Sequence, residues 1–297
     1  MNKKALRADS MLLLTSIVWG FAFVAQRVGM EHIGPFTFNG IRFALGSLSL
    51  LPLIRFLGKQ KRTPTRLVDR RFFIFGSLAA GAVLFIAASL QQIGIQYTTA
   101  GKAGFLTGLY VVLVPIAGIA LGHRTGLPTW IGAVLAAAGM YVLSAPGNLG
   151  KFNPGDLLVI VGAFFWTAHV LVIDYLSRQI DPLKLASAQF AWCALFSMVV
   201  AAIAEPLSLM AIWQAAVPIL YGGLASVGVG YTLQVVAQRD APPAHSSILM
   251  SLEGVFATIG GILLLAEPAG FRNIAGSILM LSGMIATQWD VIFRLKR

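Results

Sequence analysis

A single carboxylate, Glu253, lies near the middle of an apolar stretch of this chain. Of all the side chains, it is the one whose type and position most clearly suggest a chemical role. At a helical rise of about 1.5 Å per residue, it lies roughly 14 Å into the stretch 244–266. A charge at that depth in a bilayer is costly unless it is paired or protonated. We therefore expect a proton carrier or a counter-ion for a cationic substrate, with a structural hydrogen bond to backbone amides or Arg42 as the alternative.

Arg42 is the second charged side chain inside an apolar stretch. It lies roughly 10 Å from one end of 36–57. At that position it could hold a substrate carboxylate, pair with Glu31 or Glu253, or extend its guanidinium toward the lipid headgroups. Gln189 holds the corresponding place in the second half of the chain and keeps the polarity without the charge.

Four ring-bearing side chains complete the set of candidate site residues. Tyr110 lies at the depth of Glu253 in the equivalent stretch of the first half and could donate a hydrogen bond across the cavity. His169 follows Trp166 by about one helical turn, so its imidazole could relay protons on the same face or simply be hydrogen-bonded. Trp19 and Trp166 lie near the middle of their stretches, which is the wrong depth for an interfacial anchor. They are expected either to line a cavity or to pack helices together.

Glutamines near the ends of the apolar stretches are expected to belong to loops and mouths: Gln91, Gln92, Gln96, Gln234 and Gln238.

The elements that position these residues occur twice. Trp19 and Pro35 recur as Trp166 and Pro182 at an offset of 147, and Arg42-Phe43-Ala44 matches Gln189-Phe190-Ala191 at the same offset. A repeat of half the chain indicates duplication, as in many secondary transporters. We place the first unit at 1–146 and the second at 152–297. Gly132, Gly139 and Met140 recur as Gly276, Gly283 and Met284 at an offset of 144, and at that offset Leu109 is the counterpart of Glu253, so the acid breaks the symmetry.

Each half contains five apolar stretches long enough to cross a hydrocarbon core of about 30 Å. Apolar residues make up 57% of the chain and charged residues 11%, which excludes an ordinary soluble domain. We expect an all-α polytopic membrane protein of ten transmembrane helices: 10–29, 36–57, 72–96, 101–121, 128–145, 155–177, 183–204, 213–237, 244–266 and 272–293. Because five is odd, the second half must be inverted, and two inverted five-helix repeats would surround a central cavity that opens alternately to each side.

The charge distribution fixes the predicted orientation. If both termini are cytoplasmic, seventeen of the 22 Lys and Arg residues lie on the cytoplasmic side and four on the other, with Arg42 inside a span. We expect a multi-pass protein of the cytoplasmic (inner) membrane with both termini in the cytoplasm. The basic segment 59–71 is then a topology signal, and the net charge of +11 does not indicate nucleic acid.

Proline and glycine mark special positions in the spans. Pro115 is expected to kink or interrupt the fourth helix. The spaced glycines of the fifth and tenth helices suit close packing, within the chain or across a homodimer: Gly132, Gly139, Gly276 and Gly283. The lone Cys193 lies inside a span and is interpreted as a small buried apolar residue.

Several local motifs resemble the EamA-type branch of the drug/metabolite transporter superfamily. They are Trp19-Gly20, Arg42-Phe43, Phe105-Leu106-Thr107-Gly108 leading to Pro115, Ser251-Leu252-Glu253, Glu267-Pro268 and the paired glycines. The resemblance covers about residues 10–293. Two positions depart from the family pattern: Gly254 stands where proline is common, and His123 where an acid is common. The resemblance implies that spans 1–4 and 6–9 enclose the cavity, while spans 5 and 10 are peripheral.

These features predict a secondary transporter for a small metabolite, amino acid or drug-like molecule. The resemblance implies efflux. A membrane-embedded enzyme is the alternative, but the chain has no H-E-x-x-H, G-x-S-x-G or Walker A motif. A channel or a non-transporting scaffold is the third possibility. We expect a small-molecule substrate and the lipid bilayer as partners, no cofactor and no metal. Protons as coupling ion and a homodimer stay open.

Overall fold

In a computed structural model of the chain, residues 3–60, 69–123, 125–144 and 154–293 are described, and their regular structure is helical throughout. The first half contains α1 (Lys3–Gly29), α2 (Pro35–Gln60), α3 (Arg70–Gly94), η1 (Ile95–Tyr97), α4 (Ala100–Thr107), α5 (Tyr110–Ala120) and α6 (Leu127–Ser144). The second contains α7 (Pro154–Ser177), α8 (Pro182–Ala204), α9 (Leu209–Gln214), α10 (Ala216–Leu220), η2 (Tyr221–Tyr231), α11 (Thr232–Gln238), α12 (Pro243–Met250), α13 (Glu253–Leu265) and α14 (Phe271–Phe293).

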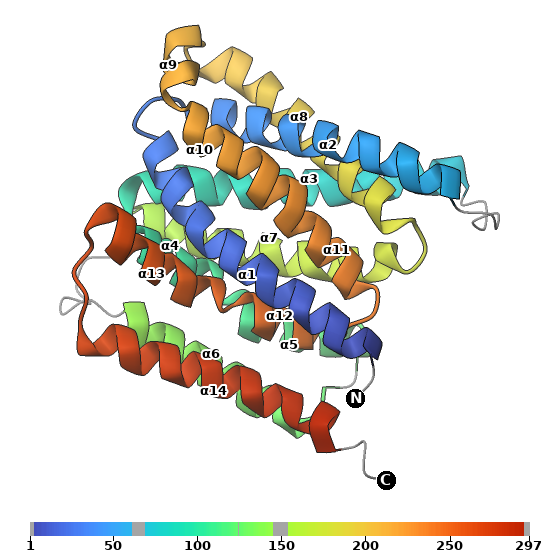
Figure 1. Cartoon of the computed structure of the whole chain (residues 1–297), viewed down its shortest axis with the longest axis vertical. Coiled ribbons are helices and arrows are strands. Elements are labelled where there is room, and N and C mark those ends of the chain that lie inside the picture. The colour runs from blue at the N-terminus through green and yellow to red at the C-terminus, as the bar shows by residue number, and fades with distance from the viewer. Residues whose placement is uncertain (1–2, 61–68, 124, 145–153, 294–297) are drawn as a thin grey trace.

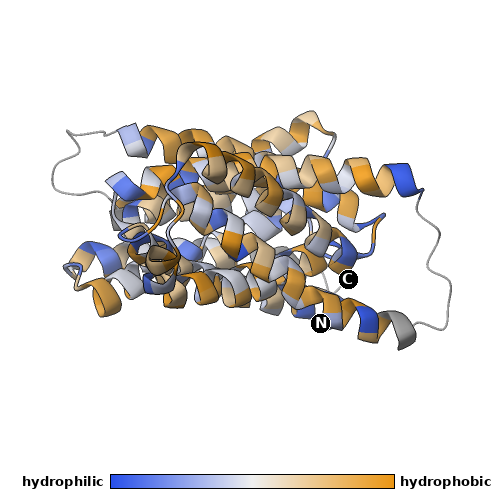
Figure 2. Cartoon of the chain, turned by 90° about the horizontal axis from the view of Figure 1, so that it is seen from above, coloured by the Kyte–Doolittle hydropathy of each residue, from blue (hydrophilic) through white to orange (hydrophobic). Residues whose placement is uncertain are grey.

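Eight helical stretches in the described part of the chain are long and apolar enough to cross a membrane. They are 3–29, 35–57, 70–97, 100–120, 154–177, 182–204, 216–238 and 243–265; two shorter apolar helices cover 127–142 and 271–286. The helices pack into one bundle in which α1 begins and α14 ends at the same end (Figure 1). Hydrophobic residues cover the flanks of the helices, whereas strongly hydrophilic ones gather mostly at the two ends (Figure 2).

Capping side chains explain where two of these helices begin. The carboxylate of Glu205 accepts hydrogen bonds from Phe36 N at 2.8 Å and Thr37 N at 2.7 Å, in the first turn of α2. Asp181 accepts from Leu183 N at 3.1 Å, in the first turn of α8. Both helices open with proline, whose fixed φ and missing N–H suit a first turn. These caps satisfy amides that would otherwise lack partners.

Two of the spans are interrupted, at equivalent places. Between α4 and α5, Leu109 N bonds to Leu106 O at 3.4 Å and Val111 N to Gly108 O at 2.9 Å. Between α12 and α13, Leu252 N bonds to Leu249 O at 3.3 Å and Gly254 N to Ser251 O at 3.1 Å. These i→i−3 bonds are a tight turn between two α-helical halves.

The predicted interruption of the fourth span at Pro115 is therefore misplaced. The interruption lies at Gly108 and Leu109, and Pro115 lies inside the continuous helix α5. Pro115 has no N–H, so α5 lacks one helical hydrogen bond at this residue. The interruption of the span comes from the i→i−3 hydrogen bonds of Leu109 and Val111, which lie before Pro115 in the chain.

The spaced glycines bring α6 and α14 together at one edge of the bundle (Figure 1). A Cβ atom on Gly139 would lie 2.6 Å from Gly276 O, and one on Gly283 would lie 2.6 Å from Gly132 O. The two contacts are reciprocal, since Gly139 and Gly283 are counterparts, as are Gly132 and Gly276. The close packing that these glycines allow is therefore between two helices of the same chain.

Some sequence predictions fall on residues outside the described ranges. These are the boundary between the two proposed units, at 146–152, and part of the basic segment, with Lys61, Arg62 and Arg66.

Candidate substrate site and its access path

A small chamber lies at the centre of the bundle, where α1, α2, α5, α7 and α13 meet η2. Its volume is about 20 Å³, roughly the room that one water molecule requires. Its lining consists of aromatic, charged, amide and hydroxyl side chains among apolar ones: Trp19, Ala22, Phe23, Gln26, Arg42, Gln91, Thr107, Tyr110, Trp166, Val170, Ser226, Tyr231, Gln234, Met250 and Glu253. Five of the seven predicted site residues are therefore brought together here.

Three aromatic rings form one wall of the chamber. The ring of Tyr231 lies 4.4 Å from Trp19 and 6.0 Å from Trp166, between centroids, and is stacked on the latter at 28°. Trp19 Nε1 donates to Ser226 O at 3.3 Å, and Trp166 Nε1 donates to Gln91 Oε1 at 2.9 Å. The two tryptophans thus have fixed orientations on either side of a tyrosine that the sequence analysis did not single out.

Glu253 is the first residue of α13 and is 3% exposed. Tyr110, the first residue of α5, donates its hydroxyl to Glu253 Oε1 at 3.1 Å. Tyr110 was expected to donate a hydrogen bond across a cavity, and the structure shows that its acceptor is Glu253. The matching interruptions make Tyr110, not Leu109, the counterpart of Glu253, because each residue directly follows the tight turn of its span.

Arg42 is 1% exposed and is held by aromatic rings and one amide. Its guanidinium carbon lies 4.9 Å from the ring centroid of Phe43 and 5.4 Å from that of Phe38, within the range of cation–π attraction. Its Nε donates to Asn39 Oδ1 at 2.9 Å, and one terminal nitrogen, Nη2, has no hydrogen-bond partner. Among the described residues Arg42 forms no ion pair with Glu31 or Glu253. It therefore presents a donor without a partner beside the chamber.

His169 and Gln189 lie behind the chamber wall and do not line it. The two side chains are hydrogen-bonded to each other, His169 Nε2 to Gln189 Oε1, at 2.9 Å, and both are fully buried. The imidazole meets Trp166 edge-on, with centroids 5.9 Å apart. In this structure the pair supports the aromatic wall, while His169 Nδ1 and Gln189 Nε2 have no partner.

Three glutamines of the lining, Gln26, Gln91 and Gln234, were not predicted as site residues. Gln91 is helical and 5% exposed, and its Nε2 donates to Gln26 Oε1 at 3.0 Å. Gln92 Nε2 also donates to the backbone oxygen of Gln26, at 3.3 Å. The expectation that Gln91 and Gln92 belong to a loop or mouth was therefore wrong for both. Distance from the end of an apolar stretch does not reveal which helix face a side chain occupies.

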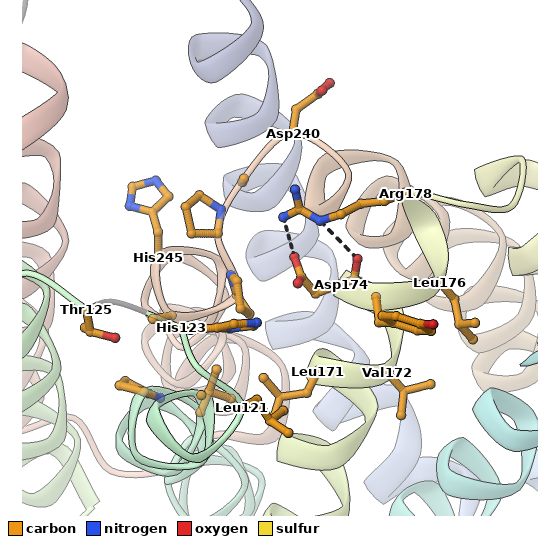
Figure 3. A pocket seen from close by; sticks show the side chains of 18 of the residues that line it. Leu121, His123, Thr125, Leu171, Val172, Asp174, Leu176, Arg178, Asp240 and His245 are labelled. Atoms are coloured by element: carbon orange, nitrogen blue, oxygen red, sulfur yellow. Dashed lines mark hydrogen bonds and ion pairs between the residues drawn. The ribbon is translucent and has the colours of Figure 1, made fainter.

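A much larger vestibule, of about 1400 Å³, opens at the end of the bundle where α1 begins. It is lined by the start of α1 and α3, the ends of α5 and α7 and the turn between α11 and α12. Apolar side chains such as Leu171, Val172 and Leu121 form its walls, and charged ones stand around them (Figure 3). Among these, Arg178 Nη2 is paired with Asp174 Oδ1 at 2.7 Å.

Helices pack closely on the side of the chamber away from the vestibule. A Cβ on Gly20 of α1 would collide with Phe256 of α13, and one on Gly104 of α4 would lie 3.2 Å from Ala257 Cβ. The hydrogen bonds that the side-chain amides of Gln91 and Gln92 donate to Gln26 form a polar layer on this side. The molecule therefore has a wide vestibule at one end and a small chamber in the middle, with closely packed helices beyond the chamber.

The EamA-like transporter family model matches residues 6–145 and again residues 153–288. The chain belongs to the EamA-like transporter family. It is therefore a multi-pass membrane transporter of this family, as the motif resemblance indicated, and its relatives are named accordingly.

An uncharacterized transporter of Archaeoglobus fulgidus is 28% identical over 289 residues, covering 95% of this chain and 86% of the relative. The uncharacterized transporter YoaV of Bacillus subtilis is 23% identical, covering 92% and 94%. A crystal structure with a TM-score of 0.78 and 16% identity covers 98% of this chain and 99% of its own, which supports the fold alone.

Proposed function

We propose that this EamA-like protein is a secondary transporter that moves a small molecule across the cytoplasmic membrane by alternating access. Its ten helices would form two inverted five-helix repeats. The reciprocal glycine contacts of α6 and α14 and the matching interruptions before Tyr110 and Glu253 support this symmetry. The observation that carries the proposal is a polar and aromatic chamber that adjoins a wide vestibule on one side and closely packed helices on the other.

The excess of Lys and Arg supports an orientation with both termini in the cytoplasm. The vestibule, which opens at the end where α1 begins, would then face the cytoplasm and admit a substrate for efflux. The chamber is far smaller than the 300–1,000 Å³ that ligand sites usually occupy. A substrate would enter the chamber only as the helices around it move apart, which is the motion that alternating access requires.

The chamber chemistry favours a small flat molecule that carries both an ammonium and a carboxylate. Arg42 presents a donor without a partner for a carboxylate, and Glu253 presents an acceptor for a cation. The Trp19–Tyr231–Trp166 wall suits a planar apolar group. The positive charge of Arg42 is balanced by the acid Glu253, so the chamber carries no excess of positive charge. A highly anionic substrate such as a nucleotide sugar therefore fits poorly.

Thermal stabilisation of the purified protein tests this assignment. A ligand at a hundredfold excess over its Kd stabilises the folded state by about 2.7 kcal/mol. The panel would contain planar zwitterions, planar amines, planar carboxylates and a nucleotide sugar. We expect the zwitterions to stabilise most, with the response to carboxylates lost in Arg42→Gln and that to amines lost in Glu253→Gln.

Arg55→Gln, an exposed position on the same helix as Arg42, is the matched control and should respond like the wild type. Stabilisation only by compounds with neither charge, or a response that both chamber variants keep in full, would overturn the substrate assignment.

A further inference from the structure

Two buried hydrogen-bond donors lie next to each other on α2, beside the chamber. Arg42 Nε donates to Asn39 Oδ1 at 2.9 Å, one helical turn away. Arginine has no acceptor, so the Asn39 atom that receives this bond is the carbonyl oxygen, and the free end of the side chain is its NH2 group. Neither Asn39 Nδ2 nor Arg42 Nη2 has a hydrogen-bond partner, although the two residues are only 0% and 1% exposed.

The positive charge of Arg42 also has no acid directly against it. None of the ion pairs among the described residues includes Arg42. Its guanidinium lies between the rings of Phe38 and Phe43, and its stem lies against Gly222 of η2, where a Cβ would come within 3.3 Å of Arg42 Cδ. Cation–π attraction offsets part of the cost of burying this charge, but it leaves the N–H donors unused.

Glu253, the acid of the chamber lining, is bonded elsewhere. Its Oε1 accepts from the hydroxyl of Tyr110 at 3.1 Å, and its carboxylate is not within the 4 Å of Arg42 that an ion pair requires. The chamber, of about 20 Å³, has room for roughly one water molecule. A halide ion is little larger than a water molecule, whereas a molecule that carries a carboxylate needs a wider chamber.

We propose that Asn39 and Arg42 form a subsite for one monovalent anion, which is a halide ion in the small chamber and the carboxylate of the substrate in a widened one. The amide and the guanidinium offer neighbouring N–H donors that both anions accept. The negative charge of the anion neutralises the buried guanidinium, which offsets the cost of taking both charges out of water. The carboxylate part of the proposal rests on the proposed function, and the halide part does not.

Thermal unfolding of the purified full-length chain in sodium chloride and in sodium gluconate, at equal ionic strength, tests the halide part. Gluconate is itself an anion, but it is far too large for the small chamber. The wild-type Tm should be about 2–4 °C higher in chloride, because chloride binds the folded chain and not the unfolded one. Arg55→Gln removes an exposed cation from the same helix and should keep this difference, so it is the matched control for general salt effects.

Three chamber variants separate an anion subsite from a merely structural contact. Arg42→Gln should lose the chloride difference, because the cation is gone. Asn39→Asp should lose it as well and be more stable than the wild type in gluconate, since the new carboxylate lies beside the guanidinium and takes the place of the anion. Glu253→Gln should keep or enlarge the difference, because it removes a negative charge that repels an anion in the same chamber.

Competition between benzoate and chloride tests the carboxylate part. Benzoate should raise the wild-type Tm in gluconate and raise it less in chloride, because the two anions compete for the same donors. Benzylamine, an amine of similar shape, should give the same increase in both salts. A benzoate effect that is absent, or equal in the two salts, would overturn the carboxylate part and assign the subsite to the halide alone.

The halide part has its own contrary result. Equal wild-type Tm values in chloride and gluconate, or a chloride difference that Arg42→Gln and Asn39→Asp both keep in full, would overturn the subsite. Neither result bears on whether the protein transports a substrate, which a transport assay in liposomes decides separately.

Discussion

Tyr110 and Glu253 occupy the same place in two interrupted spans, 143 positions apart, and the tyrosine hydroxyl donates to the glutamate carboxyl at 3.1 Å. The interruptions are equivalent hydrogen bond by hydrogen bond, since the bond from Leu109 N to Leu106 O corresponds to that from Leu252 N to Leu249 O. The two halves of the chain thus meet at the chamber through one donor and one acceptor. The counterpart of Glu253 in the first repeat is therefore Tyr110, the residue that donates a hydrogen bond to it.

Tyr110→Phe should destabilise the protein, because a buried carboxyl loses a hydrogen-bond partner at a cost of about 1–3 kcal/mol. A lower Tm of the purified variant is the expected result. Tyr141→Phe, which removes a hydroxyl from a half-exposed side chain of α6, should leave the Tm within experimental error. Equal Tm changes for the two variants would mean that the hydrogen bond does not form.

Trp166→Phe should weaken ligand binding more than Trp19→Phe does. The phenyl ring preserves the apolar wall, but it removes the donor to Gln91 Oε1 at 2.9 Å, whereas the bond of Trp19 is longer, at 3.3 Å. The apparent Kd of a stabilising compound, measured by thermal shift, should rise in the order wild type, Trp19→Phe, Trp166→Phe. Trp213→Phe, on a side chain that is 77% exposed, should leave the Kd unchanged. The reverse order for the two chamber tryptophans would contradict the account of the wall.

Gly139→Ala and Gly283→Ala should each destabilise the chain by a similar amount, because each added methyl meets a backbone oxygen of the facing helix. Overpacking of this kind costs typically 1–3 kcal/mol. Gly162→Ala is the matched control, since its Cβ would lie 3.5 Å from Leu90 Cβ, an ordinary contact, and alanine favours the helix. The check is the Tm together with the size of the particle in detergent. A changed oligomeric state without a loss of Tm would place these glycines in an interface between copies.

Glu267 lies beyond the end of α13 and gives a pH-dependent prediction for stability. Burial raises the pKa of its carboxyl, although the amide of Ala100 and the charge of Arg27 oppose this. A raised pKa in the folded state means that stability is greatest below the ordinary carboxyl pKa and is lost as the pH rises through the higher value. The Tm difference between wild type and Glu267→Gln should therefore shift against the wild type as the pH rises from about 4 to neutral. A shift in favour of the wild type would contradict this sign.

Much of the fold could be predicted from the sequence, since length and apolarity alone locate the membrane segments. Where a side chain points within a helix bundle was harder to predict. Gln91 lies near the end of its helix, yet its face is turned to the chamber, and Tyr231 stands in a glycine-rich stretch that gives no sign of an aromatic wall. Hydrophobic periodicity fails for such helices because lipid-facing and core-facing sides are both apolar.

The residues of the chamber lining were predicted best where a polar residue is conspicuous in an apolar segment, as for Glu253 and Arg42. It was predicted less well where the exact register mattered. The glycine pairs suggest an offset of 144 and thus Leu109 as the partner of Glu253, whereas the hydrogen bonds of the tight turns set the offset at 143 and select Tyr110. Pro115 is a strong signal for an interruption, but the backbone had already turned at Gly108 and Leu109.

Counterflow in proteoliposomes tests the central claim most directly. Liposomes containing the purified protein would be loaded with the compound that stabilises it best, then diluted into a trace of the same labelled compound. We predict transient accumulation of label that is absent from protein-free liposomes, strongly reduced by Arg42→Gln and Glu253→Gln, and unchanged by Arg55→Gln. No accumulation with folded wild-type protein, or equal accumulation in the chamber variants, would contradict a transporter that carries its substrate through this chamber.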